Sequence, residues 1–331
     1  MCIRDRRAFL FAAITSTLLL GQGVVQYAPK VDPALPSYAS TRSLDATIEC
    51  VGSDSLTDVW EEWKLGFLAV QPKARFKVTQ TLSTISVKAL MDGVVELIHL
   101  PRELTPTEHQ AFEKKFGYPP TKLVVCFDAF IVFVNKGNPI RDIGMDQLDA
   151  VYSTTHNAGF RKGQPVESWG DLGVRGDYAA RPIHPYMRAE GTAARGTIRD
   201  LVLLKGTFSP AVRDTLDWPG IAEGVMTDAS GIGIATLSNW LIHNKVLAVT
   251  PLQTKEAVPP TQENVVSGRY PLARTYYFYL NRAPGTALSV PLYEFLTFVF
   301  SHQGQTAVTQ ASIFPLPADI AQLYRKRLRS N

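Results

Sequence analysis

A repeated order of strand, polar turn and helix near the start of the chain constrains its fold more than any other feature. Residues 46–51 form a short apolar run, and the turn at residues 52–55 separates this run from a helical pattern of apolar residues. Similar runs at 76–80 and 94–100 follow, with a second helical pattern between them. Strands joined through helices in this order form right-handed βαβ units, so we expect a mostly parallel sheet flanked by helices.

Two long apolar runs, at residues 122–135 and 269–281, are candidates for strands that cross between lobes. The block between them has its own helical and strand-like patterns, and more helices follow the second run. The expected elements are helices at 146–152, 192–204, 291–301 and 303–311, and strands at 225–228 and 232–235.

The pattern predicts an α/β protein of two lobes, with the second lobe inserted into the first and two strands acting as the hinge. Lobe 1 would comprise residues 46–130 plus 268–325, and lobe 2 residues 131–267. Two consecutive, independent domains are the alternative arrangement.

The first 28 residues are typical of an export signal, because Arg6 and Arg7 precede an apolar stretch that is too short to cross a bilayer. The same residues fit either a twin-arginine signal or an ordinary secretory signal. Residues 29–45 contain several prolines and are predicted to be a linker. We therefore expect a periplasmic or otherwise exported protein that is soluble and monomeric.

Composition excludes several functional classes. A formal net charge of +4 over 331 residues gives no electrostatic footprint for nucleic acid. The basic run at 325–329 is expected to be a solvated tail. The six histidines are scattered singly, each expected at the surface or at a helix end, so neither a metal nor another cofactor is predicted. Cys50 and Cys126 fall in apolar runs and are interpreted as buried thiols, with a disulfide as the alternative.

The chemistry is expected at the turns that follow strands. In an open α/β sheet, ligands bind outside the carboxyl ends of strands, where helix N-termini offer unpaired N–H groups to anions. Ser53, Asp54 and Ser55 lie in the first such turn, and Ser83 and Thr84 in the second. These residue types are also common helix caps, so each turn alone is weak evidence for an anion site.

A third turn, at residues 188–192, combines a cation with a helix start. The forked guanidinium of Arg188 suits bidentate contact with an oxyanion, although a surface salt bridge is the alternative. Glu190 would accept a hydrogen bond from a protonated anion and repel a fully ionised one, which would favour hydrogen phosphate over sulfate. Gly191 and Thr192 complete this turn.

Over residues 46–318 the chain resembles the phosphate-binding proteins of bacterial ABC importers, which have the class II periplasmic-binding-protein fold. The resemblance is carried by seven short motifs. These are 52–56 with Trp63, 83–90 with Gly93, 101–104 with Glu108, 128–130 to 138–139, 169–173, 188 with 191–192, and 270–274.

The resemblance implies that the lobes close around the anion and that a membrane permease receives it. The residues that it places at or near the family's anion-contacting positions are Ser53, Ser55, Ser83, Arg102, Arg188, Glu190, Gly191 and Thr192. The chain departs from the family in three places. Residues 81–86 lack the usual glycines, Glu190-Gly191-Thr192 replaces Ser-Gly-Thr, and Pro101 removes a hydroxyl and a backbone donor.

Motifs for enzymes are absent from the sequence. There is no Gly-x-Ser-x-Gly elbow, P-loop or HExxH, and the segment 228–233 is interpreted as a turn entering a strand. Tyr276 and Tyr277 are interpreted as sheet packing and not as metal ligands. We therefore expect an exported receptor for a small oxyanion, phosphate first, and no catalytic residues. The alternative is an exported domain that has lost the anion and serves in protein interaction or surface attachment.

Overall fold

Strand β4 (Thr121–Asn135) belongs to both halves of the molecule. The computed structural model describes residues 27–239 and 243–329, so the expected export signal lies almost wholly outside the described residues. Residues 121–129 of β4 pair antiparallel with β11 (Ala273–Leu280), and residues 130–134 pair antiparallel with β8 (Gly231–Thr236). The strand therefore changes partner between Ala129 and Phe130, and it joins two half-sheets into one nine-stranded sheet.

A bulge interrupts the ladder between β4 and β11. Tyr276 faces Cys126, whereas the next residue, Tyr277, faces Val124. Val125 is therefore an extra residue in β4, and it sets which side chains of the following segment point to each face.

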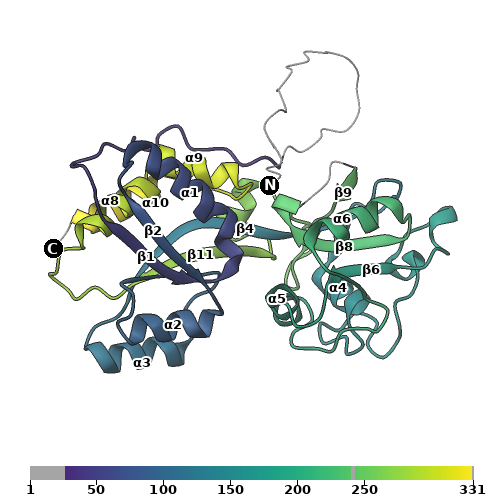
Figure 1. Cartoon of the computed structure of the whole chain (residues 1–331). Coiled ribbons are helices and arrows are strands. Elements are labelled where there is room, and N and C mark those ends of the chain that lie inside the picture. The colour runs from purple at the N-terminus through teal and green to yellow at the C-terminus, as the bar shows by residue number, and fades with distance from the viewer. Residues whose placement is uncertain (1–26, 240–242, 330–331) are drawn as a thin grey trace, which may run out of the picture.

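The first half-sheet has the order β2-β1-β3-β11-β4, and helices cover both of its faces. Figure 1 shows α1, α8, α9 and α10 above this half-sheet and α2 and α3 below it. Its strands are β1 (Thr47–Gly52), β2 (Arg75–Gln80) and β3 (Leu97–Leu100). Its helices are α1 (Thr57–Val70), α2 (Ser83–Met91), α3 (Pro106–Phe116), α8 (Val290–Val299), α9 (His302–Gln310) and α10 (Ala318–Arg329).

The second half-sheet continues from β4 through β8 to β6 (His184–Arg188) and β7 (Arg213–Thr215), and β9 (Asn244–Val246) pairs with the end of β4. A separate ladder joins β5 (Asp142–Gly144) to β10 (Ala248–Thr250). The helices of this part are α4 (Met145–Tyr152), α5 (Ala193–Leu201), α6 (Trp218–Thr227) and α7 (Gln262–Val266).

The parallel strands arise from the expected βαβ order, since β1 pairs parallel with β2 and β3, and β6 pairs parallel with β7 and β8. The expected strand at 225–228 is wrong, because these residues end helix α6. Asp217 caps that helix by accepting a hydrogen bond from the Gly220 N–H at 2.9 Å, and the buried Val225 packs in the core.

Residues 29–45, expected to be a linker, pack against the body of the protein. Leu35, Tyr38 and Leu44 are buried in the core. The Tyr38 hydroxyl donates to the buried carboxylate of Glu294 at 2.7 Å, and the main-chain N–H of Leu44 donates to the side chain of Gln71 at 3.0 Å. A proline-bearing leader can thus be ordered when its few apolar side chains find a core to enter.

The two cysteines of the described residues, Cys50 and Cys126, are free and buried, which confirms the thiol interpretation. Burial raises the pKa of both thiols well above the ordinary value, so they remain protonated at neutral pH. Tyr276 is a buried strand residue, as expected, and Gly231 begins β8 directly after the turn at 228–230.

Candidate anion-binding site

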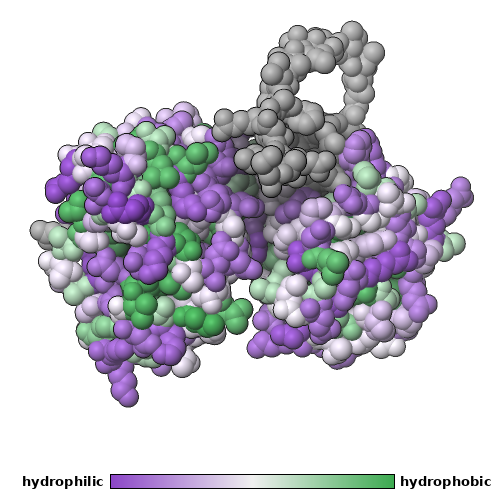
Figure 2. All heavy atoms as spheres, viewed as in Figure 1, coloured by the Kyte–Doolittle hydropathy of each residue, from purple (hydrophilic) through white to green (hydrophobic). Residues whose placement is uncertain are grey.

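The carboxyl ends of the strands in both halves point toward the same central region. In the first half, β11 begins beside Ala129 and runs antiparallel to β3, so β3 and its parallel neighbours end toward the second half. In the second half, Thr236 at the end of β8 pairs with Phe130, and β6 and β7 run parallel to β8. The turns that follow β1, β2, β6 and β7 therefore face one another, and Figure 2 shows a groove between the two halves.

The first turn, after β1, is built around the buried hydroxyl of Ser53. This oxygen accepts hydrogen bonds from the Ser55 N–H at 3.4 Å and the Ser55 hydroxyl at 3.0 Å. Asp54 is exposed beside them. Ser53 thus caps the short 3-10 helix of Asp54–Leu56, which shows that the capping role and the expected position at the strand end coexist.

His99 supports this turn from below, and the expectation that it lies at the surface or at a helix end is wrong. Its side chain is fully buried, and both of its ring nitrogens have hydrogen-bond partners inside the protein. The indole N–H of Trp60 can only donate, so it fixes Nδ1 of His99 as the acceptor at 3.1 Å, and Nε2–H then donates to the Ser53 carbonyl at 2.7 Å. Gly52 is required here, because a Cβ on it would lie 2.0 Å from Nδ1.

The His99 ring makes stability depend on pH. Burial lowers the pKa of His99 to about 4, whereas the unfolded chain has a value near about 6.5. Below pH about 6.5 the unfolded chain takes up a proton that the folded protein refuses. The free energy of unfolding should therefore fall by roughly 3 kcal/mol as the pH falls from about 6.5 to 4.

Urea titrations across this pH range test the effect of His99. His99→Gln should remove most of the slope, whereas His109→Gln, which changes a side chain that is 42% exposed, should keep it. An unchanged slope in His99→Gln would show that other groups cause the acid sensitivity.

The second turn leads into α2, whose N-terminus has no side-chain cap. Leu82 occupies the N-cap position and offers no oxygen, so the first N–H groups of α2, at Ser83 and Thr84, find no cap there. Ser83 is half-buried and Thr84 is exposed. Leu82 and Ile85 are 65% and 52% exposed, so this turn presents free donors among apolar side chains.

In the second half, Arg188 ends β6 at the edge that faces the groove. Its guanidinium is only partly exposed and has no hydrogen bond or ion pair with any residue of the described chain, and its Nε is fully buried. The contact that it makes is with the indole of Trp218, whose centroid lies 5.2 Å from Cζ. The alternative of a surface salt bridge does not occur within the described residues, so the charge is free to meet an anion.

The other predicted residues of the third turn differ in role: two are exposed to solvent, and the third caps helix α5. Glu190 and Gly191 are exposed, and Gly191 adopts φ +83°, a left-handed conformation that favours glycine. The Thr192 hydroxyl donates to the Ala189 carbonyl at 2.9 Å and accepts from the Arg195 N–H at 3.4 Å, so it caps α5. Thr192 therefore shapes the turn and does not offer a free hydroxyl proton.

Arg102 is already engaged by a neighbouring carboxylate. Its two terminal nitrogens donate to the two oxygens of Glu108 at 2.7 and 2.8 Å, and NH1 also donates to the Glu103 carbonyl at 2.8 Å. Glu108 in turn forms a capping box with Thr105 at the start of α3. An anion at the turn after β3 would have to compete with this bidentate pair.

The strand register thus places the turns at 53–55, 83–84 and 188–192 at facing edges, while the Arg102 guanidinium is paired elsewhere. The sequence alone did not point to Trp218, because a tryptophan between Asp217 and Pro219 is typical of the start of a helix and suggests no binding role. Its proximity to Arg188 depends on the pairing of β6 with β7, which brings Arg188 beside Thr215. His99 was missed for a similar reason, since its partners lie 39 and 46 positions away.

Neither a metal site nor a membrane span emerges from the parts of the chain at 27–239 and 243–329. Within them, no group of three or more His, Cys, Asp or Glu side chains could hold a metal ion. No helix there has both the length and the apolar character needed to cross a bilayer.

A sheet shared by two halves, with helix starts from both facing a common groove, defines a two-lobed receptor of the class II periplasmic-binding-protein type. Residues 37–303 match the family model described as the PBP superfamily domain, and the chain belongs to this superfamily.

Relatives and solved structures agree with this assignment. The phosphate-binding protein PstS of Pseudomonas aeruginosa is 32% identical over 96% of this chain and 98% of its own length. Protein SphX of Synechococcus elongatus is 26% identical over 74% of this chain and 70% of its own. A possible phosphate-binding protein from Planctomyces limnophilus shares the fold with a TM-score of 0.67 and 17% identity, covering 86% of this chain and 98% of that one.

Proposed function

We propose that this chain is the phosphate receptor of an ABC importer: an exported, periplasmic and monomeric binding protein that captures the anion in the groove and passes it to a permease. The observation that carries the proposal is the guanidinium of Arg188, which lacks a polar partner in the described chain and belongs to the last residue of β6, at the groove edge of the second half. The chain is a receptor and not an enzyme, and it needs no cofactor. The 32% identity to a protein named for phosphate binding supports this choice of anion.

The groups at the groove divide the work of holding a phosphate. The planar fork of Arg188 can donate two hydrogen bonds to two phosphate oxygens. Ser83 supplies a hydroxyl from the first lobe, and Ser53 and Ser55 would supply theirs by giving up the hydrogen bonds that they donate to Asp54 and Ser53. The N-terminus of α2 adds backbone donors and its positive dipole end. The exposed carboxylate of Glu190 would accept a hydrogen bond from hydrogen phosphate and would repel sulfate. Asp54, Thr84 and Gly191 complete the predicted contact set. Arg102 and Thr192 also belong to it, but Arg102 is paired with Glu108 and Thr192 caps α5.

A thermal-shift and calorimetric screen with phosphate, sulfate, molybdate and tungstate tests this function. A ligand that binds the folded state alone adds about 2.7 kcal/mol of stability at 100 times its Kd. Phosphate should therefore raise Tm by several degrees and release heat with one-to-one stoichiometry, while sulfate should do neither. A flat response to all four oxyanions would contradict the proposal.

A second candidate function is an exported domain that has lost the anion and binds another macromolecule or attaches at a surface. The exposure of Leu82 and Ile85 at the turn before α2 favours it, as does the engagement of Arg102 by Glu108. His99, which could have blocked the groove, lies buried behind Ser53 instead. The same screen separates the two candidates, because this one requires that no oxyanion changes Tm.

The boundaries between the two lobes are a separate proposal. We infer lobe 1 to comprise 46–130 plus 268–325 and lobe 2 to comprise 131–267, with residues 29–45 as a packed N-terminal extension of lobe 1. The change of partner in β4 between Ala129 and Phe130 supports the first boundary. Export through residues 1–28 is likewise proposed on the sequence pattern.

A further inference from the structure

We propose that Trp218 is a positioning residue that holds Arg188 in its anion-binding orientation, as the outer member of an aromatic bridge to the hinge. The inference rests on the proposed function, and it concerns a residue that the sequence patterns do not single out. The bridge consists of Arg188, Trp218, Phe130 and Arg274, each of which contacts the next.

The outer contact is the one between Arg188 and Trp218. Cζ of Arg188 lies 5.2 Å from the indole centroid, within the range of a cation–π interaction. Because the guanidinium has no hydrogen bond with the described residues, this ring is what restricts its orientation. The contact leaves the terminal N–H groups of the fork free to donate in the plane of the guanidinium, as bidentate recognition requires.

The backbone around this contact is fixed by hydrogen bonds between the two turns. The Ala189 N–H donates to the Thr215 carbonyl at 3.0 Å, and the Thr215 hydroxyl donates to the Met187 carbonyl at 3.2 Å. Asp217 caps α6 directly before Trp218. The indole therefore stands on a frame that is tied to both sides of Arg188, which is what a positioning group needs.

The inner contact joins Trp218 to the hinge. Its ring lies 6.2 Å from that of Phe130, which is fully buried at the point where β4 changes partner. The Phe130 N–H donates to the Leu272 carbonyl at 3.0 Å, and its carbonyl accepts from the Tyr270 hydroxyl at 2.9 Å. Phe130 thus bonds to the second segment that passes between the halves.

The bridge ends beside the first-lobe turn. Arg274 places Cζ 4.1 Å from the centroid of the Phe130 ring, and it pairs with the buried carboxylate of Asp128. Tyr276, in the same cluster, donates from its hydroxyl to the Ser55 carbonyl at 3.1 Å. The groups proposed to hold the anion in the two lobes are therefore connected through one aromatic pair at the hinge.

Phosphate affinity of Trp218 variants tests the positioning role. Trp218→Leu keeps an apolar side chain but removes the π face, and we expect calorimetry to show phosphate Kd raised about ten-fold. Trp218→Phe restores a π face and should stay within about three-fold of the wild type. The matched control is Phe208→Leu, which removes another arginine stack of this half, where Cζ of Arg195 lies 4.3 Å from the ring centroid. This control should lower Tm without changing Kd.

Equal Kd values for Trp218→Leu and Trp218→Phe, or a Kd loss in Phe208→Leu as large as in Trp218→Leu, would overturn the positioning role. A double-mutant cycle of Trp218→Leu with Arg188→Ala, measured by urea unfolding without phosphate, tests the contact separately. We expect a coupling of about two- to five-fold in the folding equilibrium constant. If the wild type binds no phosphate, the proposed function is wrong. If the double-mutant cycle also shows no coupling between Trp218 and Arg188, the proposed aromatic bridge is wrong as well.

Discussion

Replacing Arg188 with alanine is expected to weaken phosphate binding by at least about 100-fold while leaving the fold intact. Hydrogen bonds to a charged group contribute about 1.5–3 kcal/mol each, so the loss of a bidentate contact exceeds about 3 kcal/mol, or two decades in Kd. The fold should survive because Arg188 makes no hydrogen bond or ion pair through its side chain within the described residues. Isothermal titration with phosphate measures the first effect, and urea unfolding measures the second.

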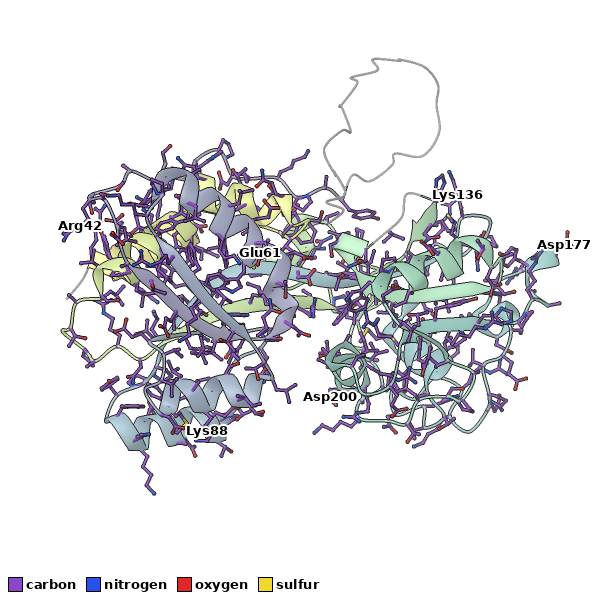
Figure 3. All side chains as sticks on the ribbon, viewed as in Figure 1. Arg42, Glu61, Lys88, Lys136, Asp177 and Asp200 are labelled. Carbon is purple, nitrogen blue, oxygen red and sulfur yellow. The ribbon has the colours of Figure 1, made fainter. Side chains whose placement is uncertain are left out.

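Arg175→Ala is the matched control for this prediction, since it removes the same charge from the other side of the second half. Arg175 is exposed, and Figure 3 shows Asp177, two residues later, at the outer tip of the molecule. This variant should bind phosphate like the wild type. Similar affinities for Arg188→Ala and the wild type would show that the anion, if bound, is held elsewhere.

Asp128→Asn should lower the free energy of unfolding by about 3 kcal/mol, the largest stability loss that we expect from a change of one charge. Asp128 is 2% exposed and pairs with Arg274, whose side chain is 11% exposed. Without the carboxylate, the guanidinium remains buried with no compensating charge. Urea unfolding at neutral pH measures the loss.

Two further variants separate the buried charge from a general effect of the substitution. Asp45→Asn breaks the ion pair with Arg75, whose partners are 66% and 60% exposed, and should leave the unfolding midpoint unchanged. Arg274→Met added to Asp128→Asn should recover part of the lost stability, because the uncompensated charge is gone. If the double variant is less stable than Asp128→Asn, the explanation by an unpaired charge is wrong.

The architecture was predictable because it depends on patterns that repeat locally. Apolar runs near residues 46, 76 and 122 became β1, β2 and β4, and the run at 269–281 contains β11. The miss at 225–228 has a local cause. Val225 and Met226 have a short apolar pattern that fits a strand and a helix equally, and the cap at Asp217 decides between them from eight residues away.

The candidate site was predictable only in part, because hydrogen-bond partners come from distant segments. Polar residues at strand ends marked the turns at Ser53, Ser83 and Arg188, and the strand register brings these turns to the facing edges of the two halves. The sequence did not reveal that Arg102 pairs with Glu108, that Thr192 caps its own helix or that Trp218 stacks on Arg188. Whether such a group binds a ligand or another group of the protein depends on which groups the fold brings near it, and residue type alone does not determine this.

The bulge at Val125 has a consequence for the whole length of β4. Side chains of a strand alternate between faces, so one added or removed residue inverts the facing of everything that follows it. Without the bulge, a regular ladder continued from the pair of Tyr277 and Val124 would place Phe127 opposite Arg274, and Asp128 would point to the other face. The irregular backbone at Val125 thus keeps Asp128 opposite Arg274 despite the extra residue, and it keeps Phe130 facing the side on which the Trp218 ring lies.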